Sequence, residues 1–196
     1  MILNCTKKTK DRFHIKYANE FENQCDKMKT ESVIEKEKED ELLNWGLKYF
    51  SFNKRKCIQL VNFKTKFNLY FFDININDLD FLGGMIACYL LELYKEDKTV
   101  IELLKKLFEE SPICVFSKLE NKSIISTLNS NEEYFSLNGY RFYDYIDEDG
   151  LKAFKINKDA NWHYLVSIDK GKRYIYPAEE FKKALIERFR YGNNKN

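Results

Sequence analysis

The sequence predicts an α+β fold, in which an antiparallel β-meander packs against helices, with a C-terminal β-hairpin and helix. Residues 46–74 contain β-branched and aromatic runs separated by polar turns, which is typical of consecutive antiparallel strands. Residues 78–110 carry leucine and isoleucine at three- and four-residue intervals, which indicates helices. A polar turn at residues 169–172 precedes a last helical pattern, and this turn predicts the hairpin.

The first part of the chain combines a short strand with a polar excursion. Residues 1–5 are apolar and are followed by Thr6-Lys7-Lys8, as expected for a strand that leaves the core toward solvent. Residues 16–41 are mostly polar and end in alternating Glu and Lys. Because mixed charge at helical spacing favours a solvated face, we expect an exposed helix or a mobile segment there.

The meander is predicted in three strands, at residues 46–52, 57–61 and 67–74, with turns at 53–56 and 62–65. Polar residues of this kind separate strands in antiparallel hairpins. The first turn presents a small basic cluster, Lys54, Arg55 and Lys56.

A helix is predicted next, over residues 78–94. It contains Gly83 and Gly84, each of which costs about 1 kcal/mol relative to alanine in a helix. A lone Gly-Gly pair is weak evidence of a phosphate loop, so we expect these glycines to permit close packing.

The middle of the chain is expected to add a second helix, a strand and a short third helix. Thr99 and Glu102 have the spacing of a capping box, which predicts a helix over residues 100–110. Residues 113–116 are expected to form a strand, and residues 121–129 to form a helix, because Ile124, Ile125 and Leu128 recur at helical intervals.

The C-terminal third is rich in tyrosine and phenylalanine. The elements predicted there are strands within 134–145 around turns at Asn138-Gly139 and Asp149-Gly150, a hairpin pairing 162–168 with 173–176, and a helix from Pro177 to Arg190. We expect a core domain at residues 1–131, including the polar excursion, and an aromatic and basic extension at 132–196 packed on that core as one unit.

Composition favours a protein of the cytoplasm with a proper core. The 196 residues are 44% hydrophobic, enough to bury a core without disulfides or metal. The cysteines are scattered without a C-x-x-C pair: Cys5, Cys25, Cys57, Cys88 and Cys114. This pattern suits buried thiols in a reducing compartment. The sequence shows neither a secretory signal nor an apolar run of about 18 residues, so we expect no membrane partner.

Charge gives only a weak indication of a nucleic-acid partner. The net charge is +2, which is too small to attract nucleic acid over the whole surface. The last residues, 170–196, nevertheless hold eight Lys or Arg against three Glu. The C-terminal end is therefore the better candidate for an anionic partner.

Several of these segments resemble a bacterial and mobile-element family of uncharacterised domains, domain of unknown function 6933. The residues that carry the resemblance are Met1-Ile2, Cys5-Thr6-Lys7-Lys8, Trp45, Arg55-Lys56-Cys57, Asn121-Lys122-Ser123, Leu128-Asn129 and Tyr176-Pro177. The family pattern has an Arg, a Gly and a final Asp where this chain has Lys122, Ser126 and Ser130. The resemblance implies a cytoplasmic α+β module, sometimes encoded near mobile elements, and it implies no particular activity.

Catalytic and metal-binding patterns are weak. His14 and His163 lie outside any familiar motif, and a structural or surface role suits each better than acid–base catalysis. Acid pairs such as Asp78 with Asp80 or Glu132 with Glu133 are more typical of caps and turns than of Mg²⁺ sites. We therefore predict no cofactor, no metal and no catalytic residue.

Two groups of residues are candidates for binding. Asn121, Lys122, Ser123 and Asn129 surround a predicted helix N-terminus that could bind an anion or a peptide backbone, or could simply cap the helix. Trp45, Lys54, Arg55, Lys56, Lys172 and Arg173 could contact phosphates and stack on bases.

The leading functional hypothesis is a non-enzymatic interaction protein, a phage- or element-encoded inhibitor or accessory factor that binds a protein partner. The first alternative is a nucleic-acid-binding module that uses the Arg55 turn and the basic C-terminal segment. The second is a nuclease or toxin-like enzyme whose carboxylates meet only in the fold. The sequence leaves all three open.

Overall fold

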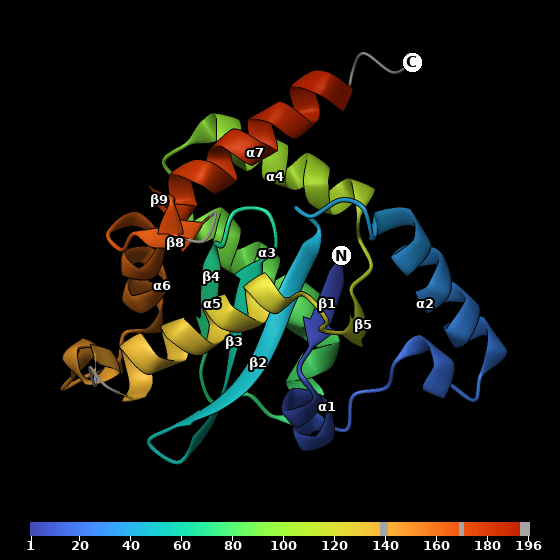
Figure 1. Ribbon diagram of the computed structural model, residues 1–196, viewed down its shortest axis with the longest axis horizontal. Helices are drawn as coiled ribbons and strands as arrows, with labels where there is room; N and C mark the ends of the chain where they lie inside the picture. The colour runs from blue at the N-terminus through green and yellow to red at the C-terminus, as the bar shows by residue number, and fades with distance from the viewer. Residues whose placement is uncertain (138–140, 169–170, 193–196) are drawn as a thin grey trace.

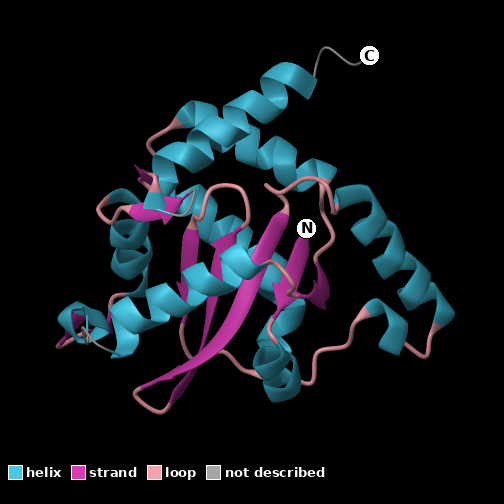
Figure 2. Cartoon of the chain, viewed as in Figure 1, coloured by secondary structure: helices cyan, strands magenta, loops and turns pink. Residues whose placement is uncertain are grey.

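Five strands form one mixed sheet in the computed structural model, which describes residues 1–137, 141–168 and 171–192 (Figures 1 and 2). The strand order is β4-β3-β2-β1-β5, with β1 parallel to both β2 and β5 and the β2-β3-β4 meander antiparallel. The strands of this sheet are β1 (Ile2–Cys5), β2 (Asn44–Phe52), β3 (Arg55–Asn62), β4 (Asn68–Phe71) and β5 (Val115–Lys118). The predicted meander and the α+β class are confirmed.

Helices surround this sheet. They are α1 (Lys7–Phe13), α2 (Gln24–Glu37), α3 (Leu82–Leu93), α4 (Lys98–Glu110), α5 (Lys122–Glu132), α6 (Ala153–Trp162) and α7 (Pro177–Gly192). Two small hairpins complete the fold: β6 (Ile146–Asp147) with β7 (Gly150–Leu151), and β8 (Val166–Ile168) with β9 (Arg173–Ile175). None of the helices in the described ranges is long and apolar enough to cross a bilayer.

Each face of the sheet has its own helical cover. Trp45 and Leu47 of β2 pack into the main core together with apolar residues of α3, α4 and α7. The intervening Gly46 faces α5, where a Cβ atom on this glycine would lie 2.2 Å from Cγ2 of Ile124. The alternation of side chains along β2 therefore sorts the helices onto two sides of the sheet, and α5 lies across one of these sides (Figure 1).

The edge strand β4 is covered by asparagine side chains of α6. Asn157 accepts a hydrogen bond from the Tyr70 amide at 2.7 Å and donates to the Tyr70 carbonyl at 2.9 Å. Asn161 makes the same pair with the backbone of Asn68, at 2.8 and 2.7 Å. Both side chains are fully buried. They complete the hydrogen bonds that a further strand would make and protect the sheet edge.

The polar excursion contains a helix that is anchored at its end. Residues 24 to 37 form α2, which is mostly exposed. Of the two expected alternatives, an exposed helix or a mobile segment, the structure shows the exposed helix. Glu37 departs from this pattern, because it is buried and ion-pairs with the α-amino group of Met1. Ser111 donates a hydrogen bond of 2.7 Å to the same carboxylate, so α2 is tied to the start of β1 and the end of α4.

The C-terminal third departs most from the predicted elements. Residues 133 to 137 and 141 to 145 form π and 3-10 turns instead of strands, because Phe135 and Phe142 stack at 5.6 Å inside a second apolar cluster. Packing of this kind overrides the β propensity of aromatic residues. The turns predicted at Asn138-Gly139 and Asp169-Lys170 lie outside the described residues.

Smaller corrections concern the boundaries of elements. Asp97 caps α4 by accepting a hydrogen bond from the Val100 amide at 3.1 Å, so the capping box predicted at Thr99 is wrong by two residues. Trp162 ends helix α6 instead of beginning a strand. This helix has no predicted counterpart, because its inward face consists of Ile156 and Ala160 together with the two buried asparagines.

Candidate binding groove

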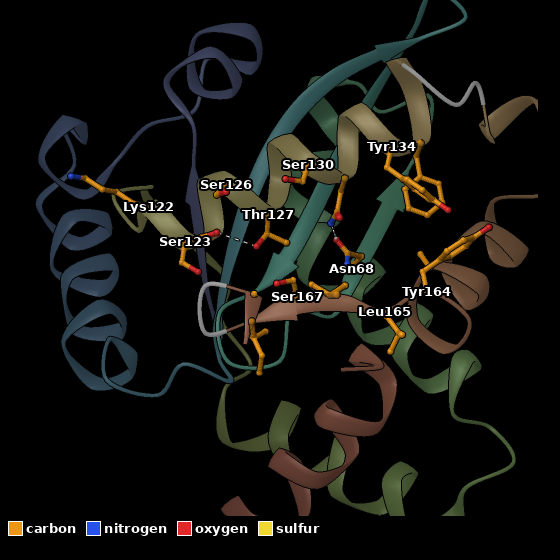
Figure 3. A pocket seen from close by; sticks show the side chains of 16 residues that line it. Asn68, Lys122, Ser123, Ser126, Thr127, Ser130, Tyr134, Tyr164, Leu165 and Ser167 are labelled. Atoms are coloured by element: carbon orange, nitrogen blue, oxygen red, sulfur yellow. Dashed lines mark hydrogen bonds between the residues drawn. The ribbon is translucent and has the colours of Figure 1, made fainter. Parts of the chain in front are cut away.

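A surface groove of about 970 Å³ lies between α5 and the β8–β9 hairpin (Figure 3). Two walls form it. From α5 and the turn after it come Lys122, Ser123, Ser126, Thr127, Ser130, Asn131, Tyr134 and Phe135. From α6, the hairpin and the segment between them come Ala160, Tyr164, Leu165, Val166, Ser167, Ile168 and Gly171, with Asn68 of β4 between the two walls. This volume is at the upper end of the range for ligand sites.

The α5 wall is polar because the helix has two different faces. Ile124 and Leu128 point at the sheet and are fully buried, whereas Ser123, Thr127 and Ser130 recur along the groove side. The Thr127 hydroxyl donates a hydrogen bond of 3.0 Å to the backbone carbonyl of Ser123. The Ser126 and Ser130 hydroxyls make no hydrogen bond to any described residue, and both serines are exposed.

Asn68 and Asn131 join the two walls. The side-chain amide of Asn131 donates a hydrogen bond of 2.5 Å to Oδ1 of Asn68. The side-chain amide of Gln59 donates one of 3.3 Å to the same oxygen. The side-chain oxygen of Asn131, Oδ1, has no hydrogen-bond partner among the described residues, which leaves a free acceptor at the groove. Oε1 of Gln59, which is fully buried, also has no protein partner.

A polar row beneath α5 holds the helix in register on the sheet. Lys48, Gln59 and Tyr70 are consecutive cross-strand neighbours on β2, β3 and β4. Lys48 ion-pairs with Glu132 and donates to Oδ1 of Asn129 at 2.7 Å. Since this row separates two apolar clusters on the same side of the sheet, it fixes where the groove wall lies.

Aromatic rings form one end of the groove. Tyr134 and Tyr164 pack edge to face with ring centroids 5.4 Å apart, and the Arg141 guanidinium lies 4.3 Å from the Tyr134 ring centroid. Desolvation raises the pKa of Tyr134, and the charge of Arg141 opposes that rise. Burial, assisted by Tyr164 and Asp159 nearby, raises the pKa of Tyr145. These phenols therefore stay neutral at physiological pH and act as hydrogen-bonding groups.

The structure separates the residues predicted around the start of α5. Lys122 and Ser123 reach the groove, although the Lys122 side chain extends away from the other lining residues (Figure 3). Asn121 caps α5 by accepting from the Ile124 amide at 3.1 Å, which is the purely structural alternative. Asn129 faces Lys48 and belongs to the polar row.

The residues proposed to contact nucleic acid do not form one surface. Trp45 is 1% exposed and packs against Phe67 and Phe181, so its predicted role as a stacking surface is wrong. Lys54, Arg55 and Lys56 sit at the tip of the β2–β3 hairpin (Figure 1).

Two of the predicted arginines already have carboxylate partners. Arg55 ion-pairs with Asp73 at 2.6 Å, and Arg173 ion-pairs with Glu180 at 3.5 Å. Lys172 and Arg173 lie on the β8–β9 hairpin, next to the groove residue Gly171. They are therefore distant in the fold from the Arg55 turn.

Most groove residues are missing from the sequence-based candidates. Ser126, Thr127, Ser130 and Asn131 follow Ser123 at three-, four-, seven- and eight-residue distances, a polar stripe that a helical projection of residues 121–132 reveals. The opposite wall carries no such signal, because Leu165 and Ser167 meet α5 only through the tertiary fold.

The histidines and acids form no comparable site. His163 contacts Asp159 at 3.0 Å on the exposed side of α6, outside the groove lining. The described parts of the chain contain no group of three or more His, Cys, Asp or Glu side chains placed to hold a metal ion.

Fold and groove together define an α+β domain with a polar surface groove. Residues 2–180 match the family described as a domain of unknown function (DUF6933), and the chain belongs to this family. No curated protein and no solved structure matches the chain significantly.

Proposed function

We propose that this protein is a non-enzymatic binding module whose groove receives an extended segment of a protein partner. The observation that carries the proposal is the row formed by the Ser126 and Ser130 hydroxyls and Oδ1 of Asn131, which have no partner among the described residues. This row faces the aliphatic side chains on the opposite wall, Leu165, Val166 and Ile168. Polar groups that fix orientation beside an apolar wall are typical of ligand sites.

The dimensions of the groove suit a short peptide. Ser123 and Asn131 are eight residues apart on α5, a distance of about 12 Å at 1.5 Å per residue. An extended chain covers the same length with about four residues. Its amides and carbonyls recur along this length and can pair with the Ser126 and Ser130 hydroxyls and with the free Asn131 oxygen.

The charge of the groove supports an uncharged contact along most of its length. Among the described lining residues, Lys122 is the one with a charged side chain, and it extends away from the others (Figure 3). An inhibitor or accessory factor of the kind expected from the sequence would act through such a contact alone, by covering a surface of its partner.

An affinity capture experiment with blocked grooves tests this proposal. Ser126→Arg and Ser130→Arg place a long side chain in the groove at exposed helical positions, and Ser32→Arg, at an exposed position on α2, is the matched control. We expect the wild type and Ser32→Arg to retain the same stoichiometric protein partner in a native lysate and both groove variants to lose it. Retention of that partner by both groove variants would contradict the proposal.

A nucleic-acid partner remains a second candidate, because Lys54 and Lys56 are exposed and form no ion pair with any described residue. Binding through these two lysines would weaken with salt and with the double change Lys54→Glu and Lys56→Glu. Electrophoretic mobility shifts at 50 and 200 mM salt would show this loss. Absence of a shift at the lower salt concentration would remove the candidate.

A further inference from the structure

The turn that begins at Arg141 places a cation at the aromatic end of the groove. Arg141 opens the 3-10 turn Arg141–Tyr145, and its guanidinium lies 4.3 Å from the ring centroid of Tyr134, which lines the groove. Stacking on an aromatic ring holds the plane of a guanidinium and leaves its N–H groups at the edge.

Arg141 has no carboxylate partner among the described residues. Its Nε is buried without a hydrogen bond, and it forms no ion pair with a described residue. By contrast, Arg188 pairs with Asp40 at 2.8 Å and with Glu110 at 2.6 Å. Buried polar atoms are almost always paired in folded proteins, so the described residues leave the hydrogen-bonding capacity of this half-buried guanidinium unused.

The chemistry of this end of the groove selects a carboxylate. A carboxylate approaching the end of a guanidinium accepts one N–H from each of the two Nη atoms in a bidentate pair. A single guanidinium balances one negative charge, which matches a carboxylate better than a doubly charged phosphate. Tyr134 and Tyr164 face each other at this end of the groove (Figure 3), and their hydroxyls can hydrogen-bond an anion.

We propose that Arg141 binds a carboxylate of the peptide segment that occupies the groove, either its C-terminus or an Asp or Glu side chain. This inference rests on the proposed function and adds to it the chemical class and the direction of the partner segment. The segment would place its carboxylate at Tyr134 and continue along α5 toward Ser123.

The test uses a random heptapeptide library displayed in two forms, one with free C-termini and one with C-termini fused to a carrier. Peptides selected on the wild-type protein are then synthesised as the acid, as the C-terminal amide, with Glu or Asp changed to Gln or Asn, and with a phosphoserine in place of the acidic residue. Fluorescence polarisation measures the Kd of each form, and thermal melting confirms that every protein variant is folded.

We expect loss of the carboxylate to weaken binding to the wild type at least tenfold. If the amide form loses affinity, the source of the carboxylate is the C-terminus, whereas loss on Glu→Gln or Asp→Asn identifies an acidic side chain. Arg141→Gln should bind charged and neutral forms equally, and Arg141→Lys should keep only part of the preference. Arg12 supplies the control, because its guanidinium also lies over an aromatic ring, 5.5 Å from the centroid of Tyr49. Arg12→Gln should keep the full preference for charged over neutral peptides.

Three results would overturn the inference. They are equal binding of charged and neutral peptides to the wild type, a preference that survives in Arg141→Gln, and tighter binding of the phosphoserine form. In each of these cases, the proposed function would still be supported if the peptides bound the Ser126→Arg variant more weakly than the wild type. Selection of no peptide, or peptides that bind Ser126→Arg as tightly as the wild type, would overturn both.

Discussion

Asn157 and Asn161 each hydrogen-bond both backbone groups of one residue in the edge strand β4. Their four-residue spacing places them on the same side of α6, and residues 68 and 70 present their free backbone groups in the same direction because strands alternate with a period of two. The sequence contains many other asparagines, and nothing local distinguishes these two as buried. Their role depends on the position of β4 next to α6, which is set by the tertiary fold, so the sequence could not predict it.

Replacing either asparagine should be costly. Asn157→Ala leaves the amide and the carbonyl of Tyr70 unpaired in a buried position, and an unsatisfied buried group costs about 1–3 kcal/mol. We expect the free energy of unfolding in urea to fall by about 2–4 kcal/mol, and by a similar amount for Asn161→Ala. Lys158→Ala, at an exposed position of the same helix, should change it by less than about 0.5 kcal/mol. Equal stabilities of Asn157→Ala and Lys158→Ala would show that the pairing contributes nothing.

Asp97 links the stability of α4 to pH. The hydrogen bond from Lys182 and, after it, those from the Val100 and Thr99 amides lower the pKa of Asp97 from its ordinary value of 3.8. Because the folded-state pKa is the lower one, the stabilising effect is complete above the ordinary value and is lost as the pH falls through the folded-state value. Asparagine also caps helices well, so Asp97→Asn removes mainly the solvent-screened ion pair with Lys182, and we expect it to be less stable than the wild type by about 0.5 kcal/mol at pH 7.

That difference should shrink as the pH falls below 4 and vanish once Asp97 is protonated in the folded protein. Urea unfolding of both proteins between pH 7 and pH 2 measures it. A difference that stays constant over this range would contradict the assigned role of the ionised carboxylate.

At the scale of elements, the helix α5 depends on one glycine of the sheet. A Cβ on Gly46 would approach Ile124 to 2.2 Å, which is closer than atoms can pack, and Leu128 to 3.3 Å, which is a tight contact, so Ile124 and the helix that carries it would have to move. Gly84 is the opposite case, because it is exposed in α3 and a Cβ there would meet nothing within 4 Å.

Alanine at these two glycines should act in opposite directions. We expect Gly46→Ala to destabilise the protein by about 1–3 kcal/mol through overpacking and Gly84→Ala to stabilise it by about 0.5–1 kcal/mol through helix propensity. Differential scanning calorimetry measures both changes. A melting temperature for Gly46→Ala at or above that of the wild type would show that α5 is not seated as described.

Strands and amphipathic helices of this chain are predictable in proportion to their periodicity. The meander consists of β-branched and aromatic runs separated by polar turns and is confirmed, as is the helix at α4, whose Val100, Leu104 and Leu107 recur at helical intervals and face the core. Residues 133–145 carry aromatic rings without a clear period, and their conformation follows the second apolar cluster. Glu37 shows the same limit, since its charge predicts exposure and its partner is the distant Met1 amino group.

At the scale of the whole molecule, the groove lies between segments that are far apart in sequence. Residues between 122 and 135 line one wall, and residues 160, 164–168 and 171 line the other. The sequence indicates the beginning of the first wall through Lys122 and Ser123, because helix starts are recognisable locally. The sequence does not predict that the β8–β9 hairpin lies opposite this wall, since no local motif indicates which helix a hairpin faces.

The predicted boundary near residue 132 can be tested through the core that both parts share. Phe181 of α7 packs against Trp45 and Phe67 with ring centroids 6.2 and 5.1 Å apart. Removing residues 132–196 would expose these rings and would also leave the β4 edge without Asn157 and Asn161. Burying one aromatic side chain contributes about 1.5–3 kcal/mol, and a domain has only about 5–15 kcal/mol in total.

We therefore expect a fragment of residues 1–131 to remain unfolded, and the full chain to unfold in a single transition followed alike by tryptophan fluorescence and circular dichroism. Trp45 is buried in the core and reports on the part before the boundary, whereas Trp162 closes α6 and reports on the part after it. A Trp162→Phe variant isolates the Trp45 signal. A dispersed amide spectrum for the fragment, or two separate transitions in the full chain, would instead make residues 1–131 an independent folding unit, with the C-terminal extension docked on it as the removable wall of the groove.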